Sequence, residues 1–279
     1  MTPLEELIRD RILSEGPIRF RRFMELALYH PEHGYYRRGR DPFGPQGDFF
    51  TAEQLQPVYG LLMARAMQSF FRELGEPEDF TIVELGAGRG EMKEAFSAWR
   101  YLPVECGAGE LPQSFTGVVF ANEFFDALPV DVAVRRGRGW RSMRVGWMGD
   151  GFVWVEAEPV DDEAVSFLKR FVGRQKEGFL AEIHLEALAW LERIARSLER
   201  GFLVVVDYGY TRQELASYPL GTLMSYYRHR ASEDVLTAPG ERDITAMVPF
   251  TALQQHGAAC GLRTLRFSRL LKFLLDAAK

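Results

Sequence analysis

The chain has 279 residues, 47% of them hydrophobic and 13% aromatic, so it can bury a full core as one large α/β domain or as a core with a smaller lobe. A formal net charge of −5 leaves no basic footprint for a nucleic acid or an anionic membrane, and the arginine-rich run 135–141 is interpreted as solvated surface. Two distant cysteines without a CxxC pair argue against a disulfide framework and a structural zinc site.

The expected location is the cytoplasm, for two reasons. No apolar run reaches the roughly 18 residues of a membrane span, so none is expected. The first ten residues include Glu5, Glu6 and Asp10, which is typical neither of a secretory signal nor of a transit peptide.

The N-terminal quarter is predicted to be helical. Thr2 and Glu5 form a capping-box pattern ahead of a first helix. Apolar residues at 3.6-residue spacing predict a second helix over 20–28 and a long one over about 53–74. We therefore expect residues 1–75 to form a helical lobe.

A glycine-rich turn follows this lobe in the sequence VELGAGRGEM, residues 83–92. The β-branched and apolar residues that precede the glycines predict a buried parallel strand, and the residues from Glu91 onward can continue as a helix. The glycines are therefore expected on a strand-to-helix turn.

Further strands and helices alternate along the rest of the chain. Apolar runs predict core strands at 102–106, 117–125 and 201–210, and a helix is expected over about 181–200. Alternation with glycine turns over about 131–160 suggests an inserted β-meander. This order predicts a doubly wound α/β sheet over residues 76–279.

The glycine spacing narrows the class of ligand. Gly86, Gly88 and Gly90 are followed by Glu91 where a dinucleotide fingerprint needs its third glycine, and no G-K-[ST] of a Walker loop is present. What remains is a close backbone turn with the carboxylate of Glu84 beside it. A nicotinamide or flavin enzyme and a ligand-free structural turn stay open as alternatives.

A cationic ligand without phosphate suits this pattern, and S-adenosylmethionine is one. Its ribose diol needs a bidentate acceptor at the end of the next strand. Glu105 lies at such an end, 19 residues after Gly86 (105 − 86). Spacing and residue type together favour an S-adenosylmethionine-dependent methyltransferase.

Several longer motifs resemble one family. The matching stretches are 22–36, 47–52, 83–92, 121–130, 204–210 and 221–253, of which ANEFFDALPV and RDITAMVPF are the most specific. They resemble the MidA-like family of class I S-adenosylmethionine-dependent methyltransferases, whose mitochondrial members are complex I assembly factors that dimethylate a protein arginine. The resemblance implies a seven-stranded class I sheet and a protein substrate, arginine being the expected side chain.

The same resemblance implies a set of site residues. Gly47, Asp48 and Thr51 would close over the cofactor, the three glycines of the turn would contact its methionine part, and Glu105 its ribose. Asn122 and Glu123 would stand near the methyl group, at the end of the fourth strand. Asp48 could instead cap a turn, and Asn122 could satisfy backbone groups at the strand end.

Methylation of a guanidinium also needs carboxylates that orient it and take its proton. Glu123 is the first candidate, Asp126 is a weaker one that could instead cap a helix, and Asp243 is a partner from a second loop. No histidine has metal-ligand spacing, so no metal site is expected.

Departures from the family pattern keep rival functions open. The segment between Glu105 and Gly117 is short, Met247 and Pro249 replace polar residues, and the chain stops where relatives continue. We therefore expect a reduced member. The alternatives are a catalytically degenerate binding or assembly protein and a small-molecule methyltransferase.

Overall fold

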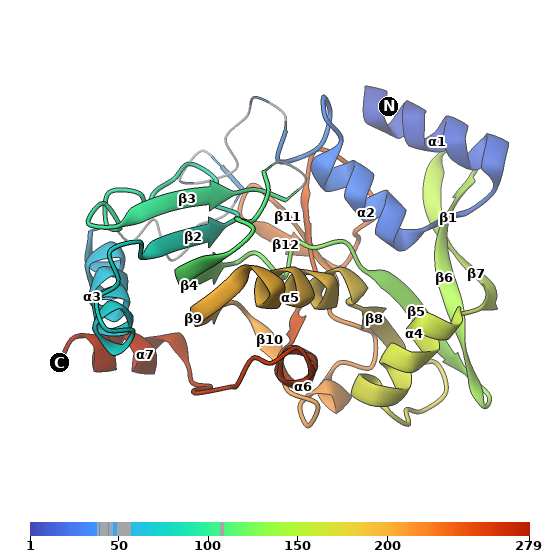
Figure 1. Cartoon of the computed structure of the whole chain (residues 1–279). Coiled ribbons are helices and arrows are strands. Elements are labelled where there is room, and N and C mark those ends of the chain that lie inside the picture. Colours follow the sequence, from blue (N-terminus) through green and yellow to red (C-terminus); the bar gives the residue numbers. More distant parts are fainter. Residues whose placement is uncertain (38, 40–43, 45–46, 49–56, 107–108) are drawn as a thin grey trace. The chain divides into compact units, whose positions relative to one another are not determined.

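The computed structural model describes residues 1–37, 39, 44, 47–48, 57–106 and 109–279 (Figure 1). The chain divides into two compact units, each made of three segments. Unit 1 comprises Met1–Phe49, Asp126–Ala187 and Gly209–Ala252. Unit 2 comprises Phe50–Phe125, Leu188–Tyr208 and Leu253–Lys279.

Unit 2 is built on a parallel sheet with the strand order β3-β2-β4-β9 (Figure 1). Its strands are β2 (Thr81–Leu85), β3 (Arg100–Val104), β4 (Phe115–Asn122) and β9 (Leu198–Val206). The family resemblance led us to expect seven strands, whereas this parallel sheet has four among the residues described. All of β2 is buried, as expected for a strand covered on both faces.

Helices cover this sheet through one apolar core. Helix α3 (Val58–Glu73) contributes Tyr59, Met63 and Met67 to the core that surrounds Ile82 and Phe120. Helix α7 (Leu270–Ala277) packs against the same core through one side of the helix. Helices α5 (Leu185–Ser197) and α6 (Phe250–Ala259) each cross a unit boundary.

The helix predicted after the glycine turn is not regular. Residues 88–98 form consecutive turns, with backbone bonds such as Lys93 N to Gly90 O at 3.0 Å and Phe96 N to Met92 O at 2.9 Å. Gly88 and Gly90 have positive φ, so right-handed helical backbone can start only after Gly90. Strand β3 begins at Arg100, which leaves little room for a full helix.

Unit 1 contains an antiparallel sheet in the order β1-β6-β5-β8, with β7 paired to β6. Its strands are β1 (Ile18–Arg19), β5 (Asp131–Arg136), β6 (Gly139–Met148), β7 (Gly151–Pro159) and β8 (Leu180–Ile183). Strands β5, β6 and β7 occupy the stretch where the sequence suggested a meander. Gly137 and Gly149, with φ of 51° and 63°, make the tight turns between them.

Two helices pack on this sheet. In α1 (Pro3–Glu15), Thr2 accepts from the N–H of Glu5 at 3.2 Å and Glu5 accepts from the N–H of Thr2 at 2.6 Å, which confirms the capping box. Helix α2 (Phe20–Tyr29) buries an apolar face. The core they share with the sheet also includes Val235 and Ile244.

Short elements complete unit 1. They are α4 (Asp162–Phe167), the π-helix η2 (Leu168–Val172), the 3₁₀ turn η3 (Leu215–Ser217), and strands β10 (Gly209–Tyr210), β11 (Met224–Tyr227), β12 (Arg230–Ser232), β13 (Asp243–Thr245) and β14 (Val248–Pro249). Strands β10 and β14 pair in parallel, whereas β11 pairs with β12 and β13 in antiparallel fashion.

Two boundaries differ from the sequence-based expectation. Helix α3 belongs with the parallel sheet of unit 2, so the compact units do not divide at residue 75. The helix expected from residue 181 begins at Leu185, because residues 180–183 pair with β5 as strand β8. In the ranges described, no helix combines the length and apolar character needed to cross a bilayer.

Candidate active site

The glycine turn lies at the carboxyl end of β2 and needs glycine at each of its three positions. Gly86, Gly88 and Gly90 have φ of 68°, 54° and 72°, a region that costs other residues about 1–2 kcal/mol. The N–H of Gly86 donates to the carbonyl oxygen of Val104 at 2.8 Å, which ties the turn to β3. A Cβ at Gly86 would lie 3.0 Å from Cδ2 of Phe124.

Glu105 directly follows β3 and contacts this turn. Its Oε1 accepts a hydrogen bond from the N–H of Gly88 at 2.8 Å. Among the residues described, Oε2 accepts no hydrogen bond, so the second oxygen can accept from a ligand hydroxyl. The sequence placed Glu105 at the end of the strand after the glycine turn, and the structure has it there.

Glu84 lies one residue before the end of β2 and is 1% exposed. The hydroxyl of Tyr101 in β3 donates to its Oε2 at 2.5 Å. No sequence motif predicts this tyrosine partner. Glu84 therefore lies inside the sheet layer, where its carboxylate helps to join β2 to β3 beneath the turn.

Asn122 and Glu123 stand at the carboxyl end of β4. Oδ1 of the buried Asn122 accepts from the hydroxyl of Tyr59 in α3 at 2.7 Å. Glu123 has a φ of 47° although it is not glycine, and its N–H donates to the carbonyl oxygen of Val206 at 2.8 Å. Residues in this strained region cost of order 1–3 kcal/mol and cluster at functional sites.

Asp207 was not singled out from the sequence, although it ends an apolar strand. Its carboxylate accepts from the N–H of Phe125 at 3.1 Å and from that of Tyr208 at 2.9 Å. It thereby fixes the backbone that follows Glu123. An acid at the carboxyl end of a parallel strand was the signal that could have identified it.

In unit 1, Asp48 is fully buried and holds a turn of its own unit. The hydroxyl of Tyr35 donates to its Oδ2 at 2.8 Å, and the N–H of Arg228 donates to its Oδ1 at 2.8 Å. His229, which matches the family motif, donates its N–H to the carbonyl oxygen of Asp48 at 2.9 Å. Gly47 is buried beside it, and Thr51 lies outside the described residues.

Two further carboxyl groups of unit 1, Asp126 and Asp243, are each 3% exposed. Oδ1 of Asp243 accepts from the hydroxyl of Tyr36 at 2.8 Å and from the N–H of Ile244 at 3.0 Å. Burial, followed by the charges of Asp126 and Asp48, raises the pKa of Asp243 to about 7. The structure thus brings two other predicted site residues of unit 1, Asp126 and Asp48, within electrostatic range of Asp243.

The residues of unit 2 fit S-adenosylmethionine. Backbone with positive φ at three glycines admits close approach of a ligand, and the acceptor oxygen of Glu105 suits a ribose diol. These features lie where ligands bind in open α/β sheets, at the carboxyl ends of parallel strands. In the described ranges, no group of three or more His, Cys, Asp or Glu side chains is placed to hold a metal ion. This fold and this site define a class I methyltransferase.

Comparisons with known proteins agree with this class. A family model for putative S-adenosyl-L-methionine-dependent methyltransferases matches residues 97–268, and the chain belongs to that family. It is 26% identical to the rat protein arginine methyltransferase NDUFAF7, mitochondrial, over all of this chain and 77% of that protein. It is 28% identical to the Drosophila melanogaster homologue, over 88% of this chain and 68% of that protein.

A solved structure gives the same result. A COG1565 superfamily member from Burkholderia thailandensis, solved with S-adenosyl-homocysteine bound, has a TM-score of 0.86 and 30% identity, over 98% of this chain and 80% of that one. The protein is therefore an S-adenosylmethionine-dependent methyltransferase with a class I fold, which confirms the family, the fold class and the cofactor predicted from sequence.

The comparisons overturn one expectation. A cytoplasmic location was predicted from the composition and the first ten residues, and this prediction is wrong. The curated relatives are named as mitochondrial proteins, which points to mitochondria rather than the cytoplasm. The prediction failed because composition reports a reducing environment and does not identify the compartment.

Proposed function

We propose that the methyl acceptor is a protein side chain, the guanidinium of an arginine. Relatives over nearly the whole chain are named protein arginine methyltransferases, at about a quarter identity. A guanidinium stays protonated at neutral pH, so its binding favours carboxylates. The carboxylates that the proposal invokes are Glu123 in unit 2 and Asp126 and Asp243 in unit 1.

The observation that carries the proposal is the burial of the Asp243 carboxyl group beside the hydroxyl of Tyr36, in unit 1 with the equally buried Asp126. Burial and two neighbouring carboxyl groups raise its pKa to about 7, so a bound cation would stabilise the ionised form. A group with this pKa also exchanges protons efficiently near neutral pH. We propose that Asp243 balances the charge of the acceptor, with Asp126 adding to the negative potential of unit 1.

Glu123 is proposed to take the proton that the guanidinium nitrogen loses when its bond to the methyl carbon forms. Two hydrogen bonds fix its backbone. The N–H of Glu123 donates to the carbonyl oxygen of Val206, and the N–H of Phe125 donates to the carboxylate of Asp207. This anchoring limits how far the carboxylate can move, and positioning supplies much of the rate of an in-line displacement. Asn122, held by Tyr59, is proposed to orient the acceptor.

S-adenosylmethionine supplies an electrophilic methyl group when it is bound. We propose that the glycine turn holds its methionine part and Glu105 its ribose, with Glu84 supporting the turn from inside the sheet. Gly47, Asp48 and Thr51 are proposed to close over it. Asp48 would act in this closure mainly through the turn at Arg228 and His229 that it holds.

The test uses S-adenosylmethionine with a deuterated methyl group and protein extract from a strain that lacks this enzyme. Mass spectrometry should find the label on arginine. Glu123→Gln should lower turnover about 10²- to 10⁴-fold while the affinity for S-adenosylhomocysteine stays nearly unchanged, since the amide keeps the shape but cannot take a proton. Glu110→Gln, at an exposed position, is the matched control.

Label on another side chain, or only on small molecules, would show that the acceptor is not arginine while leaving the enzyme class intact. Equal turnover of the wild type and Glu123→Gln on a confirmed acceptor would remove Glu123 as the base. Cofactor binding without any labelled product would favour an assembly role for the same fold.

A further inference from the structure

Glu182 is a buried carboxyl group of unit 1 to which the proposed function assigns no role. It lies in β8 and is 2% exposed. Its Oε1 accepts from the N–H of Thr222 at 2.7 Å, whereas Oε2 has no hydrogen-bond partner among the residues described. Burying a carboxyl group with an unpaired oxygen costs stability, and each such group in a native protein calls for an explanation.

The backbone around Glu182 brings this carboxyl group against Thr222. The N–H of Leu180 donates to the carbonyl oxygen of Pro219 at 3.0 Å, so the segment that precedes Thr222 runs beside β8. Gly221 has a φ of 82°, and a Cβ at this position would collide with Oε1 of Glu182. Position 221 therefore requires glycine both for its backbone conformation and for the space that the carboxyl group occupies.

Thr222 connects Glu182 to the turn between β13 and β14. Strand β11 pairs with β13 in a register that, when continued, places Thr222 opposite Met247. The N–H of Met247 donates to Oγ1 of Thr222 at 3.0 Å, so a side-chain bond holds the turn where the strand pairing has ended. This contact uses the backbone of Met247. It therefore does not depend on the polar side chain that the family pattern has at this position.

The same turn joins the two carboxyl residues that we assign to the acceptor in unit 1. The N–H of Ala246 donates to the carbonyl oxygen of Asp126 at 2.9 Å. Asp243 begins β13, on the other side of the same turn from β14. Successive N–H groups, those of Ala246 and Met247, are thus held by Asp126 and Thr222. A shift of this turn would move Asp243 relative to Asp126.

We propose that Glu182 and Thr222 are positioning residues for methyl transfer, which fix this turn and thereby the placement of Asp243 relative to Asp126. Neither residue contacts a reacting atom in this proposal. Glu182 orients Thr222, and Thr222 holds the backbone of Met247. Misplacement of a positioned group by about 1 Å can cost about 100-fold in rate. The inference rests on the proposed roles of Asp126 and Asp243 in binding the acceptor.

The test compares Thr222→Val with Thr222→Ser in the full chain. Valine keeps the shape and the N–H that donates to Glu182 but lacks the hydroxyl oxygen, whereas serine keeps it. Transfer of the deuterated methyl group to protein should slow about 10- to 100-fold in Thr222→Val and less than about threefold in Thr222→Ser. Affinity for S-adenosylhomocysteine should be unchanged in both. Amide hydrogen exchange at Met247, measured by NMR, should become faster in Thr222→Val alone.

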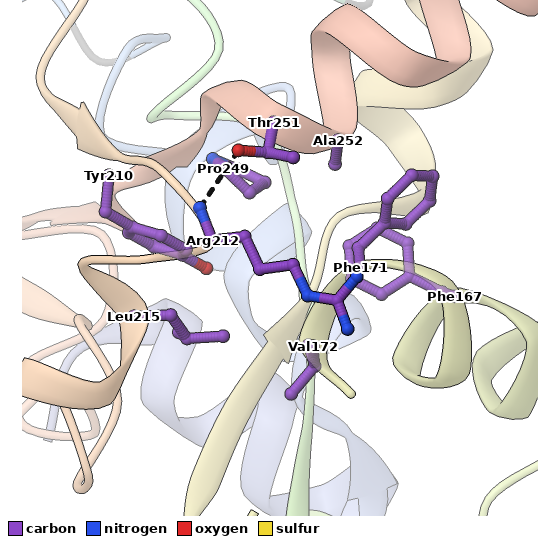
Figure 2. Close-up of a pocket in the computed structure, with 9 residues that line it drawn as sticks. All are labelled: Phe167, Phe171, Val172, Tyr210, Arg212, Leu215, Pro249, Thr251 and Ala252. Carbon is purple, nitrogen blue, oxygen red and sulfur yellow. Dashed lines mark hydrogen bonds between the residues drawn. The ribbon is translucent and has the colours of Figure 1, made fainter. Parts of the chain in front are cut away.

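Thr251 provides a matched control within unit 1. Its Oγ1 accepts from the N–H of Arg212 at 2.9 Å, which is a bond of the same kind that holds no assigned site residue (Figure 2). Thr251→Val should leave methyl transfer unchanged even where it lowers the midpoint of urea unfolding. This comparison separates a positioning role from a general loss of stability.

A second pair of variants tests Glu182. Glu182→Gln keeps an acceptor oxygen for the N–H of Thr222, so methyl transfer should stay within about threefold of the wild type, whereas Glu182→Leu should slow it as Thr222→Val does. Because the two residues act in series, the double variant Glu182→Leu/Thr222→Val should lose no more than the slower single variant. If Glu182→Leu does not fold, the Thr222 variants alone decide the test.

The inference is overturned if Thr222→Val transfers methyl groups as fast as the wild type while Asp243→Asn is slow. It is also overturned if Thr222→Ser is as slow as Thr222→Val, or if the Met247 amide exchanges equally in both. Unchanged methyl transfer in Asp243→Asn would remove the proposed role of Asp243 and this inference with it. The Asp243→Asn variant therefore distinguishes failure of the proposed function from failure of the positioning role.

Discussion

The hydroxyl of Tyr36 donates a hydrogen bond to Oδ1 of Asp243 at 2.8 Å, although the two residues are 207 positions apart in the chain. This bond lowers the pKa of Asp243, whereas burial and the charges of Asp126 and Asp48 raise it to about 7. Opposing effects thus set the pKa of Asp243 near neutral pH, and removing one of them should shift this pKa.

Tyr36→Phe removes the effect that favours the ionised form, so the pKa of Asp243 should rise by about one pH unit. The measurement is a carbon-13 NMR titration of the carboxyl groups, with Asp243→Asn identifying the resonance. Tyr29→Phe is the control, because the Tyr29 hydroxyl donates to the carbonyl oxygen of Ala127 and not to a carboxylate. An unchanged titration in Tyr36→Phe would contradict the prediction.

Glu105→Gln tests the cofactor site. The amide oxygen can still accept from the N–H of Gly88, so the turn should keep its conformation, but a ribose hydroxyl loses its charged acceptor. Affinity for S-adenosylhomocysteine should fall about tenfold or more, measured by calorimetry. Glu110→Gln should leave the affinity unchanged, and equal affinities of the two variants would exclude Glu105 from ribose binding.

A comparison of Gly86→Ala with Gly137→Ala separates the energetic cost of a positive φ from the cost of a steric clash between the added Cβ and a neighbouring side chain. Gly137 has a comparable φ of 51° with nothing near an added Cβ, so Gly137→Ala should cost only about 1–2 kcal/mol of unfolding free energy. Gly86→Ala has the same conformational cost, and its added Cβ also lies within 3.0 Å of Cδ2 of Phe124. It should lower the melting temperature further and weaken S-adenosylhomocysteine binding, whereas Gly137→Ala should bind normally.

How much of this site could be predicted from the sequence depends on how far apart in the chain the contacting residues lie. The glycine turn and Glu105 could be placed because strand-turn spacing is local, and parallel strands bring their carboxyl ends to one edge. The tyrosines that hold Glu84, Asn122 and Asp243 could not be predicted. Their partners lie 17, 63 and 207 residues away and depend on which helix packs where.

The predicted boundary of one helix was wrong for a related reason. Glu182 falls at the start of the helix expected over about 181–200, but it lies in β8, where the backbone pairs with Val132. The apolar run around it suits a strand and a buried helix equally well, and a tertiary partner decides between them. Its Oε1 then accepts from the N–H of Thr222 at 2.7 Å, a contact across 40 residues.

His184 should make the protein sensitive to acid. It is 1% exposed, and within the described chain neither ring nitrogen has a hydrogen-bond partner. Burial lowers its pKa from 6.5 to about 3. Between these values the unfolded chain binds more protons, so the unfolding free energy falls as the pH is lowered, by up to about 1.4 kcal/mol per pH unit. His184→Leu should abolish this slope in denaturant titrations, whereas the partly exposed His33→Leu should keep it.

Asp243 should contribute the opposite slope. Its pKa of about 7 lies above the unfolded value of 3.8, so the folded chain binds more protons between these values and stability falls as pH rises. In Asp243→Asn the hydrogen bond from Tyr36 can remain, and unfolding free energy at pH 7 should increase. Its rise from pH 4 to 6.5 should be steeper than in the wild type. A shallower rise would contradict the raised pKa.

The core of unit 1 joins segments far apart in the polypeptide, since Leu4 and Ile8 of α1 pack in one cluster with Val235 and Ile244. On the ribosome, the first helices emerge more than two hundred residues before these partners. At 5–20 residues per second, α1 and α2 are synthesised roughly 10–50 s before these partners. The core of unit 1 therefore cannot be completed during synthesis until residues 235–244 have been made, long after α1 and α2.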